Sequence, residues 1–286
     1  MPLMEHLREL RKRFRNAVIA LIVTTGITFA FARELIAIMI KPLADAWRGR
    51  KLGTFTLNYG NLTEPFWAEM KVSFYIGLFL GSPFVFYQLW KFVAPGLRDN
   101  ERKIALPFAI FSGLFFCGGA VFCYFLVFPT AFKFFLGYSS NDYGSFSGLF
   151  GGMADYNIGG DMQLRATLFL EPILDFSMKT MLGFGLVFEL PLAIYFLAKV
   201  GLVTHRSLWK FNKYWIVISF IIGAVLTPGP DVMSQILMAT PLLVLYQISI
   251  VVAWVVTIGR ERRKKAEEEG GGRGGVGGGA GRTGDR

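Results

Sequence analysis

The chain has 286 residues, of which 53% are hydrophobic, 16% aromatic and only 17% charged, and its formal net charge is +10. A soluble domain is less apolar and more charged, and several uninterrupted apolar runs approach the roughly 20 residues that cross the hydrocarbon core as a helix. The basic residues cluster at the ends of these runs, which indicates membrane topology and argues against nucleic-acid binding. The sequence therefore predicts an all-α integral membrane protein.

Residues 1–15 predict a cytoplasmic amphipathic helix that leads into the first span. Its apolar residues recur at helical spacing, at Leu3, Leu7, Leu10 and Phe14. Five Lys or Arg residues in the same segment are enough to hold this end in the cytoplasm. The glutamates Glu5 and Glu9 are not needed for that orientation. A surface ion pair between Glu9 and Arg13 at i,i+4 spacing would contribute only a few tenths of a kcal/mol.

Residues 16–258 predict a six-span membrane domain. The candidate spans cover about residues 16–32, 72–92, 104–128, 172–198, 214–226 and 236–258. The fifth run is short, about 20 Å at 1.5 Å per residue. Lys and Arg number five in residues 1–15, four in 91–103, four in 199–213 and eight in 258–286, but two in 129–171 and none in 227–234. These segments alternate only if all six runs cross and both termini are cytoplasmic.

The remaining segments predict two long outer connections and a tail. Residues 33–71, placed outside, fit less well because they hold six basic residues together with four acids. Residues 129–171 are also long, and the part 137–171 is rich in Gly, Ser, Asn and Asp, which is typical of an irregular cap or lid. The Gly-rich residues 259–286 predict a disordered cytoplasmic tail.

Known catalytic and cofactor-binding motifs are missing from the sequence. The Walker A pattern, HExxH and GxSxG do not occur, GxGxxG is matched only within the low-complexity Gly-rich tail, and no Cys or His cluster has metal-ligand spacing. We therefore expect no enzyme, no cofactor and no metal site.

Glu189 is the polar residue that most needs an explanation, because it lies about midway along the fourth predicted span. An ionised carboxylate there costs on the order of 3 kcal/mol, so the group should be protonated, paired or facing a cavity. It is either a hydrogen-bonding residue inside the bundle or a docking or proton site, and Pro191 should loosen the helix beside it. Gln88, Gln235 and Gln247 raise the same question more weakly, since glutamines often join helices.

Several ordered motifs resemble the TatC family, the six-span signal-peptide receptors of the twin-arginine translocase. They are "HLRELRKR" at 6–13, "KPL" at 41–43, "SPFVFYQLWKFVAPGL" at 82–97, "ERK" at 101–103, "FPTAF" at 128–132, "FGLVFELP" at 184–191 and "LTPGPDVMSQ" at 226–235. The resemblance covers about residues 5–260. It implies a tilted, concave bundle with short fifth and sixth helices in the prokaryotic cytoplasmic membrane.

The resemblance also implies a function and partners. The chain would recognise twin-arginine signal peptides of folded cargo and assemble with single-span TatA- and TatB-type proteins. The proton-motive force, without nucleotide hydrolysis, would drive export. We also expect self-association and contact with the lipid bilayer, but no binding of nucleic acid.

Individual residues of the family motifs carry these expectations. Glu9 and Glu101 match the two carboxylates that receive the arginine pair, with Arg11, Arg13 and Phe92 in the surrounding motifs. The expected intramembrane and partner-docking residues are Glu189, Gln88, Met233 and Gln235. Pro42, Pro83 and Asp231 match structural motif positions in or near loops, although "TPGPD" is one residue longer than a shorter family form, which shifts the alignment just before Asp231.

Two other classes of function stay open on the sequence alone. A proton-coupled secondary transporter would use Glu189 as its coupling site, but the chain lacks the internal repeats and additional intramembrane charges that favour this class. A purely structural scaffold would not bind a twin-arginine peptide at all.

Overall fold

The computed structural model describes residues 3–93, 105–137, 167–227, 229 and 232–273, and all its regular elements there are helices. They are α1 (Leu3–Phe29), α2 (Ala32–Gly49), α3 (Glu64–Val93), α5 (Ala105–Phe122), the π-helix η2 (Cys123–Val127), α6 (Phe128–Gly137), α7 (Leu170–Val200), α8 (His205–Leu226) and α9 (Val232–Arg273). The expectation of an all-helical protein is confirmed for these residues.

Five segments are long and apolar enough to cross a membrane, by length and composition. They are Glu64–Phe92, Pro107–Gly137, Leu170–Val200, His205–Leu226 and Val232–Gly259. The helices α1 and α2 pass the same test together but meet at a bend of 81°, and they make a sixth candidate if they form one broken span. The fifth predicted run is longer than expected, because α8 starts at His205 and not near residue 214.

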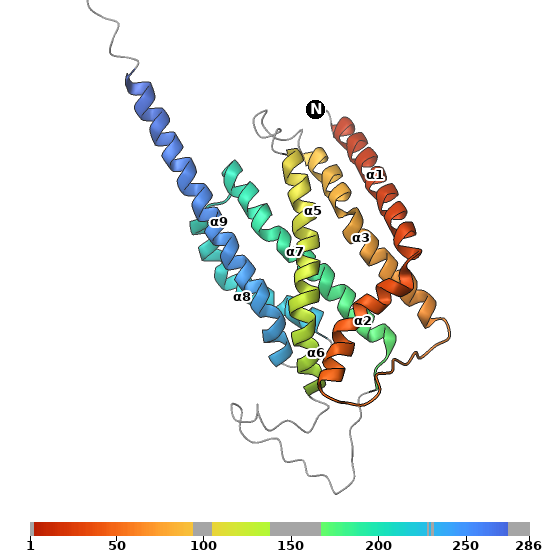
Figure 1. Cartoon of the computed structure of the whole chain (residues 1–286). Helices are drawn as coiled ribbons and strands as arrows, with labels where there is room; N and C mark the ends of the chain where they lie inside the picture. Colours follow the sequence, from red (N-terminus) through yellow and green to blue (C-terminus); the bar gives the residue numbers. More distant parts are fainter. Residues whose placement is uncertain (1–2, 94–104, 138–166, 228, 230–231, 274–286) are drawn as a thin grey trace, which may run out of the picture.

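The helices α1, α3, α5 and α7 lie side by side in that order, and each packs against the next (Figure 1). The helix α9 packs against α7 and α8, while α2 folds back across one end to meet α3 and α6. We call the end where α1 begins the N-terminal end of the bundle; α9 also finishes there (Figure 1).

Small residues set the distance between neighbouring helices. A Cβ atom on Gly77 of α3 would lie 2.8 Å from the Cα of Thr25 in α1, and one on Gly113 of α5 would lie 2.6 Å from the Cα of Pro83 in α3. A Cβ atom on Gly119 of α5 would lie 2.6 Å from the Phe184 carbonyl oxygen in α7. Helices pack closely in lipid where glycine lets the backbones approach, so glycine fixes each of the three crossings.

The core lies between α2, α3, α5, α6 and α7, and much of it is aromatic. Phe128, Phe132 and Phe176 pack with centroid distances of 5.7–6.3 Å, and Phe128 is fully buried. Large apolar side chains elsewhere point outward, among them Ile22, Leu186 and Val225. Such a surface is unfavourable in water and is what a lipid-facing helix needs.

At the end opposite the N-terminal end, hydrogen bonds connect the segments that lead into α3 and α7. Asn58 pairs with Leu168 and Leu170 through backbone hydrogen bonds of 2.9 Å. The Glu64 carboxylate accepts from the Gly60 N–H at 2.6 Å and from the N–H of Glu171 at 2.9 Å. These contacts order the part of segment 33–71 that precedes α3.

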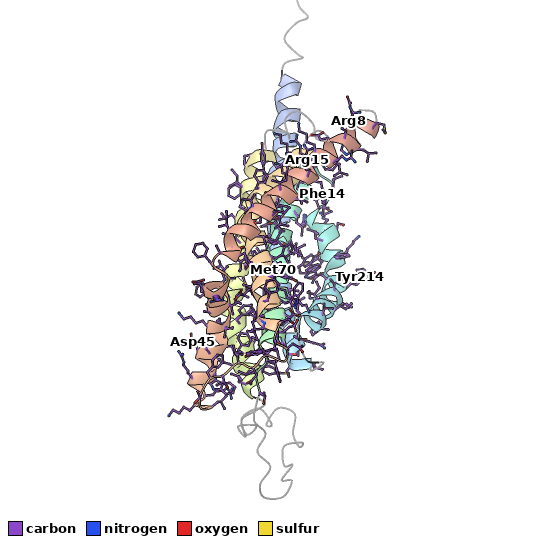
Figure 2. All side chains as sticks on the ribbon, turned by 90° about the vertical axis from the view of Figure 1, so that its right-hand side faces the viewer. Arg8, Phe14, Arg15, Asp45, Met70 and Tyr214 are labelled. Carbon is purple, nitrogen blue, oxygen red and sulfur yellow. The ribbon has the colours of Figure 1, made fainter. Side chains whose placement is uncertain are left out.

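Lys71 adds ion pairs between α3 and α7 at the same end. Its ammonium lies 2.6 Å from a Glu171 carboxylate oxygen and 3.2 Å from one of Asp175. Charges are therefore grouped at both ends of the bundle: Figure 2 shows Arg8 and Arg15 at the N-terminal end and Asp45 at the other.

Two expectations about the ends of elements are wrong. Pro42 and Pro83 lie inside α2 and α3, not in or near loops. The helix α9 continues through 259–273, where the Gly-rich composition predicts disorder, because the stretch "RERRKKAEEE" consists of strong helix formers with opposite charges at i,i+4 spacing. Residues 274–286 lie outside the described residues.

Candidate functional sites at the N-terminal end and inside the bundle

Glu9 lies at the N-terminal end of the bundle and is held by its own helix. Arg13 Nη2 donates to Glu9 Oε1 at 3.1 Å, and the side chains are 18% and 24% exposed, respectively. The spacing of four residues places both groups on one face of α1. Arg11 is exposed on the same helix. Glu101, the second expected carboxylate, lies outside the described residues.

Phe92 connects this part of α1 to α3. Its ring stacks on His6 with a centroid distance of 4.5 Å. His6 belongs to the "HLRELRKR" motif but the sequence assigns it no role; the structure adds it to the site. The stack places the last turns of α3 beside the first turns of α1, which carry Glu9.

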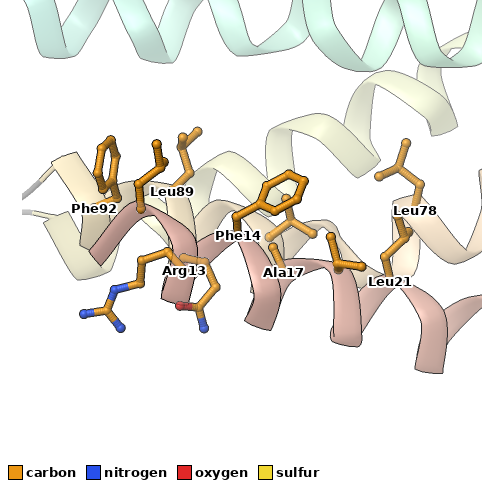
Figure 3. Close-up of a pocket in the computed structure, with 11 residues that line it drawn as sticks. Arg13, Phe14, Ala17, Leu21, Leu78, Leu89 and Phe92 are labelled. Carbon is orange, nitrogen blue, oxygen red and sulfur yellow. The ribbon is translucent and has the colours of Figure 1, made fainter. Parts of the chain in front are cut away.

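A groove of about 270 Å³ runs between α1 and α3 next to this contact. Its walls are almost entirely apolar, and Figure 3 shows Phe14, Leu89 and Phe92 along it, with the Arg13 guanidinium extending away from the Phe14 ring. Gln88 also lines this groove and is only 5% exposed. Its Oε1 atom has no hydrogen-bond partner among the described residues.

Glu189 lies in the interior part of α7, where that helix packs against α5. Its carboxyl group lies beside the Ser112 hydroxyl and the backbone of Phe116, both in α5. Glu189 Oε1 is buried and has no hydrogen-bond partner in the described part of the chain. Pro191, which is buried, follows one half-turn later within the same helix.

Ser112 is in turn bonded to α3. The indole Nε1–H of Trp90 donates to Ser112 Oγ at 3.1 Å. The sequence assigns no role to either residue. Ser112 is the single hydroxyl side chain in the run Ala105–Phe122, and that isolation in an apolar helix was the signal available.

The remaining expected residues lie elsewhere. Met233 and Gln235 are half-buried in the first turns of α9, and the Gln235 backbone approaches Gly223 of α8. This is the end of the bundle opposite Glu9 (Figure 1). Asp231 lies outside the described residues. Gln247, in contrast, joins two helices, since its amide donates to Asn212 of α8 at 2.9 Å.

Comparison with known proteins gives one consistent result. The family model described as "Sec-independent protein translocase protein (TatC)" matches residues 5–241. A TatC protein of Aquifex aeolicus is 38% identical over 252 residues, covering 87% of this chain and 93% of the relative. One of Desulforapulum autotrophicum is 41% identical over 251 residues, covering 87% and 83% of the two chains.

A solved structure agrees with these relatives. The crystal structure of the twin arginine translocase receptor TatC superimposes with a TM-score of 0.71 at 36% identity, covering 88% of this chain and 99% of that one. The helical architecture and the sequence are therefore both similar to TatC over nearly the whole chain. The chain is a multi-pass membrane protein that belongs to the TatC family of Sec-independent protein translocase proteins.

Proposed function

We propose that this chain is the receptor that binds the twin-arginine signal peptides of folded precursor proteins. The observation that carries the proposal is the half-buried Glu9 carboxylate at the N-terminal end of the bundle, on a helix otherwise rich in Arg and Lys. A carboxylate there adds nothing to membrane orientation, which depends on the basic residues. Its use is therefore recognition of a cationic ligand.

The chemistry of the ligand follows from the geometry of the guanidinium group. A planar guanidinium makes two parallel, charge-assisted hydrogen bonds to a carboxylate, which the ammonium of lysine cannot copy. We assign one arginine of the signal to Glu9 and the other to Glu101. Arg11, Arg13 and Phe92 form the surroundings of this site, with Arg13 holding Glu9 in the absence of peptide.

We assign the N-terminal end of the bundle to the cytoplasm of a prokaryotic cell, with both termini on that side of the inner membrane. The support is the gathering of basic residues at this end, which is the pattern of cytoplasmic loops. The beginning of α1 and the end of α9 share that end (Figure 1).

We assign partner contacts to polar groups in and near the bundle. Glu189 and Gln88 each have a buried oxygen without a hydrogen-bond partner in the described residues, and an unsatisfied polar group within a membrane-spanning bundle favours association with a polar partner helix. Met233 and Gln235 at the start of α9 are further candidates. The proposed partners are single-span TatA- and TatB-type proteins, together with further copies of this chain, in a bilayer whose proton-motive force drives export.

Binding of a twin-arginine peptide to the purified chain in nanodiscs tests the receptor function. The double variant Glu9→Lys/Glu101→Lys should lose binding and the preference over a twin-lysine peptide. Glu5→Lys is a matched control, because Glu5 is an exposed acid on the same helix. Undiminished binding and selectivity in the double variant would remove the assignment.

A proton-coupled transporter is the second candidate, and the partnerless Glu189 oxygen inside the bundle is the observation in its favour. Liposomes that contain this chain alone separate the two functions. A transporter gives substrate-dependent proton flux that Glu189→Gln abolishes. A receptor gives none and needs its partner proteins for transport.

A further inference from the structure

The first turns of α8 carry a stripe of exposed basic residues. Arg206, Lys210 and Lys213 recur at i, i+4 and i+7, which places them on one face of the helix, and all three are exposed. Trp209 and Tyr214 flank the stripe and are 65% and 55% exposed. This combination of basic and aromatic side chains is typical of a helix at the level of lipid headgroups.

The same face of α8 becomes apolar in its second half. Val217, Ile221 and Val225 continue the stripe at four-residue intervals, and all three are exposed. The apolar part is about 12 Å long at 1.5 Å per residue. One face thus presents cationic groups followed by aliphatic surface, which is the complement of a phospholipid whose charged headgroup is followed by acyl chains.

Acidic residues do not balance the charge of this face. Residues 190–230 contain no Asp or Glu, whereas the basic segments 1–15 and 91–103 each contain two. Arg206, Lys210 and Lys213 form no salt bridge within the described part of the chain. The Lys213 ammonium instead lies 4.9 Å from the centroid of the Tyr214 ring. The face therefore favours an anionic ligand from outside the chain.

The basic stripe also lies beside an apolar part of α9. Asn212, next to Lys213, accepts a hydrogen bond from the Gln247 amide at 2.9 Å. Gln247 is about 18 Å along the helix from Gly259, where the apolar span of α9 ends. A basic side chain beside such a segment is costly without a counter-charge. An anion bound here is therefore stabilised more than one bound at the solvated ends of the bundle.

We propose that this face of α8 binds an anionic phospholipid. The lipid phosphate pairs with Arg206, Lys210 and Lys213, and the acyl chains lie along the apolar half of the same face. The guanidinium donates two parallel hydrogen bonds to phosphate oxygens, and the ammonium groups act as point charges. A zwitterionic lipid binds more weakly, because its own cationic group lies close to three basic side chains. This site is separate from Glu9 and from the proposed receptor function.

Native mass spectrometry of the full chain released from nanodiscs tests the site. The nanodiscs contain equal amounts of phosphatidylglycerol and phosphatidylcholine with identical acyl chains, and the ratio of the two lipids retained by the protein is measured. The parent should retain phosphatidylglycerol about fivefold or more over phosphatidylcholine, since each basic residue near an anionic headgroup contributes roughly that factor. Arg206→Gln/Lys210→Gln/Lys213→Gln should lower the ratio toward one.

A matched triple variant controls for the overall charge. Arg8→Gln/Lys12→Gln/Arg15→Gln removes the same three charges from exposed positions of α1 and should keep the enrichment in phosphatidylglycerol. An equal loss in both triple variants would overturn the proposal, because it would mean that the general positive charge of the protein attracts the lipid.

A charge-conserving variant separates loss of charge from loss of fold. Arg206→Lys/Lys210→Arg/Lys213→Arg keeps three cations on the face and should keep the enrichment. Enrichment that is lost in this variant, or that is undiminished in Arg206→Gln/Lys210→Gln/Lys213→Gln, would show that the three charges do not hold the lipid.

Discussion

Arg13 donates to Glu9 across one turn of α1, at 3.1 Å, so the carboxylate proposed to receive a guest arginine already holds an arginine of its own chain. Both side chains are partly exposed, and pairs of this kind are worth about 0.2–1 kcal/mol. A signal peptide must displace Arg13 to make a bidentate contact with Glu9. The internal pair therefore lowers the affinity for the peptide.

We predict that Arg13→Gln binds a twin-arginine peptide about two- to fourfold more tightly, as measured by fluorescence anisotropy at low salt. Arg8→Gln removes the same charge from an exposed position of α1 and controls for general electrostatics. It should strengthen the binding of the cationic peptide only through its effect on the overall charge. The informative quantity is the difference in peptide affinity between Arg13→Gln and Arg8→Gln. A weaker complex with Arg13→Gln than with Arg8→Gln would mean that Arg13 contacts the peptide itself.

The stack of His6 on Phe92 is predicted to hold the first turns of α1 against α3. An aromatic pair contributes about 0.5–1.5 kcal/mol beyond its buried area. Phe92→Leu should therefore speed hydrogen exchange of the backbone amides in residues 4–10 by about two- to tenfold. Phe84→Leu is the control, because the Phe84 ring contacts Tyr87 of its own helix. Equal exchange in both variants would show that the stack does not fix the start of α1.

Sequence patterns predicted the long apolar helices well but not the amphipathic ones. The segment Ala32–Gly49 holds Arg, Glu, Lys and Asp as well as a proline, and it was placed in an outer connection. It folds as α2 because one face, with Met39, Leu43 and Trp47, is buried in the core. The buried face of α2 packs against α6 and α3, which are distant in the sequence. No local pattern in residues 32–49 therefore distinguishes this helix from a loop.

The predicted ends of two helices are wrong for a related reason. The run 214–226 was predicted by hydropathy alone, whereas α8 starts at His205 because the Thr204 side chain accepts from the Ser207 N–H and caps the first turn. The third span continues beyond its predicted end, through η2, to Gly137.

The residues of the candidate sites likewise fall into those that the sequence indicates and those that it does not. Glu189 was recognised because a carboxylate is conspicuous in an apolar segment, whereas only the family motif distinguishes Glu9 from Glu5. Trp90 and Ser112 were not recognised, because the isolation of Ser112 in an apolar helix does not by itself indicate which helix it meets, and that depends on how α3, α5 and α7 pack. Contacts between helices are the part that a single sequence does not contain.

Thr28 provides a direct hydrogen bond between α1 and α3. Its buried hydroxyl lies 2.7 Å from the Ser73 carbonyl oxygen, and interhelical bonds of this kind in membranes contribute about 0.6 kcal/mol on average. We predict that Thr28→Val, which keeps the shape, lowers the free energy of unfolding by about 0.5–1.5 kcal/mol in a denaturing-detergent titration. Thr24→Val is the control, since the Thr24 hydroxyl bonds only to Ala20 and Leu21 of its own helix, and a loss as large there would argue against the interhelical bond.

Gly119 and Gly118 are neighbours in α5 with opposite surroundings. A Cβ atom on Gly119 would meet the Phe184 carbonyl oxygen and the Cα of Gly185 at 2.6 and 2.8 Å, whereas one on Gly118 would find no atom within 4 Å. Because the obstructing atoms are backbone, Gly119→Ala must push α5 away from α7. We predict a loss of about 1–3 kcal/mol in the free energy of unfolding for Gly119→Ala, and an unchanged or slightly higher value for Gly118→Ala, since alanine favours the helix. Two alanine variants with equal stability would contradict the close crossing, because that outcome requires α5 and α7 to have room for a methyl group at Gly119.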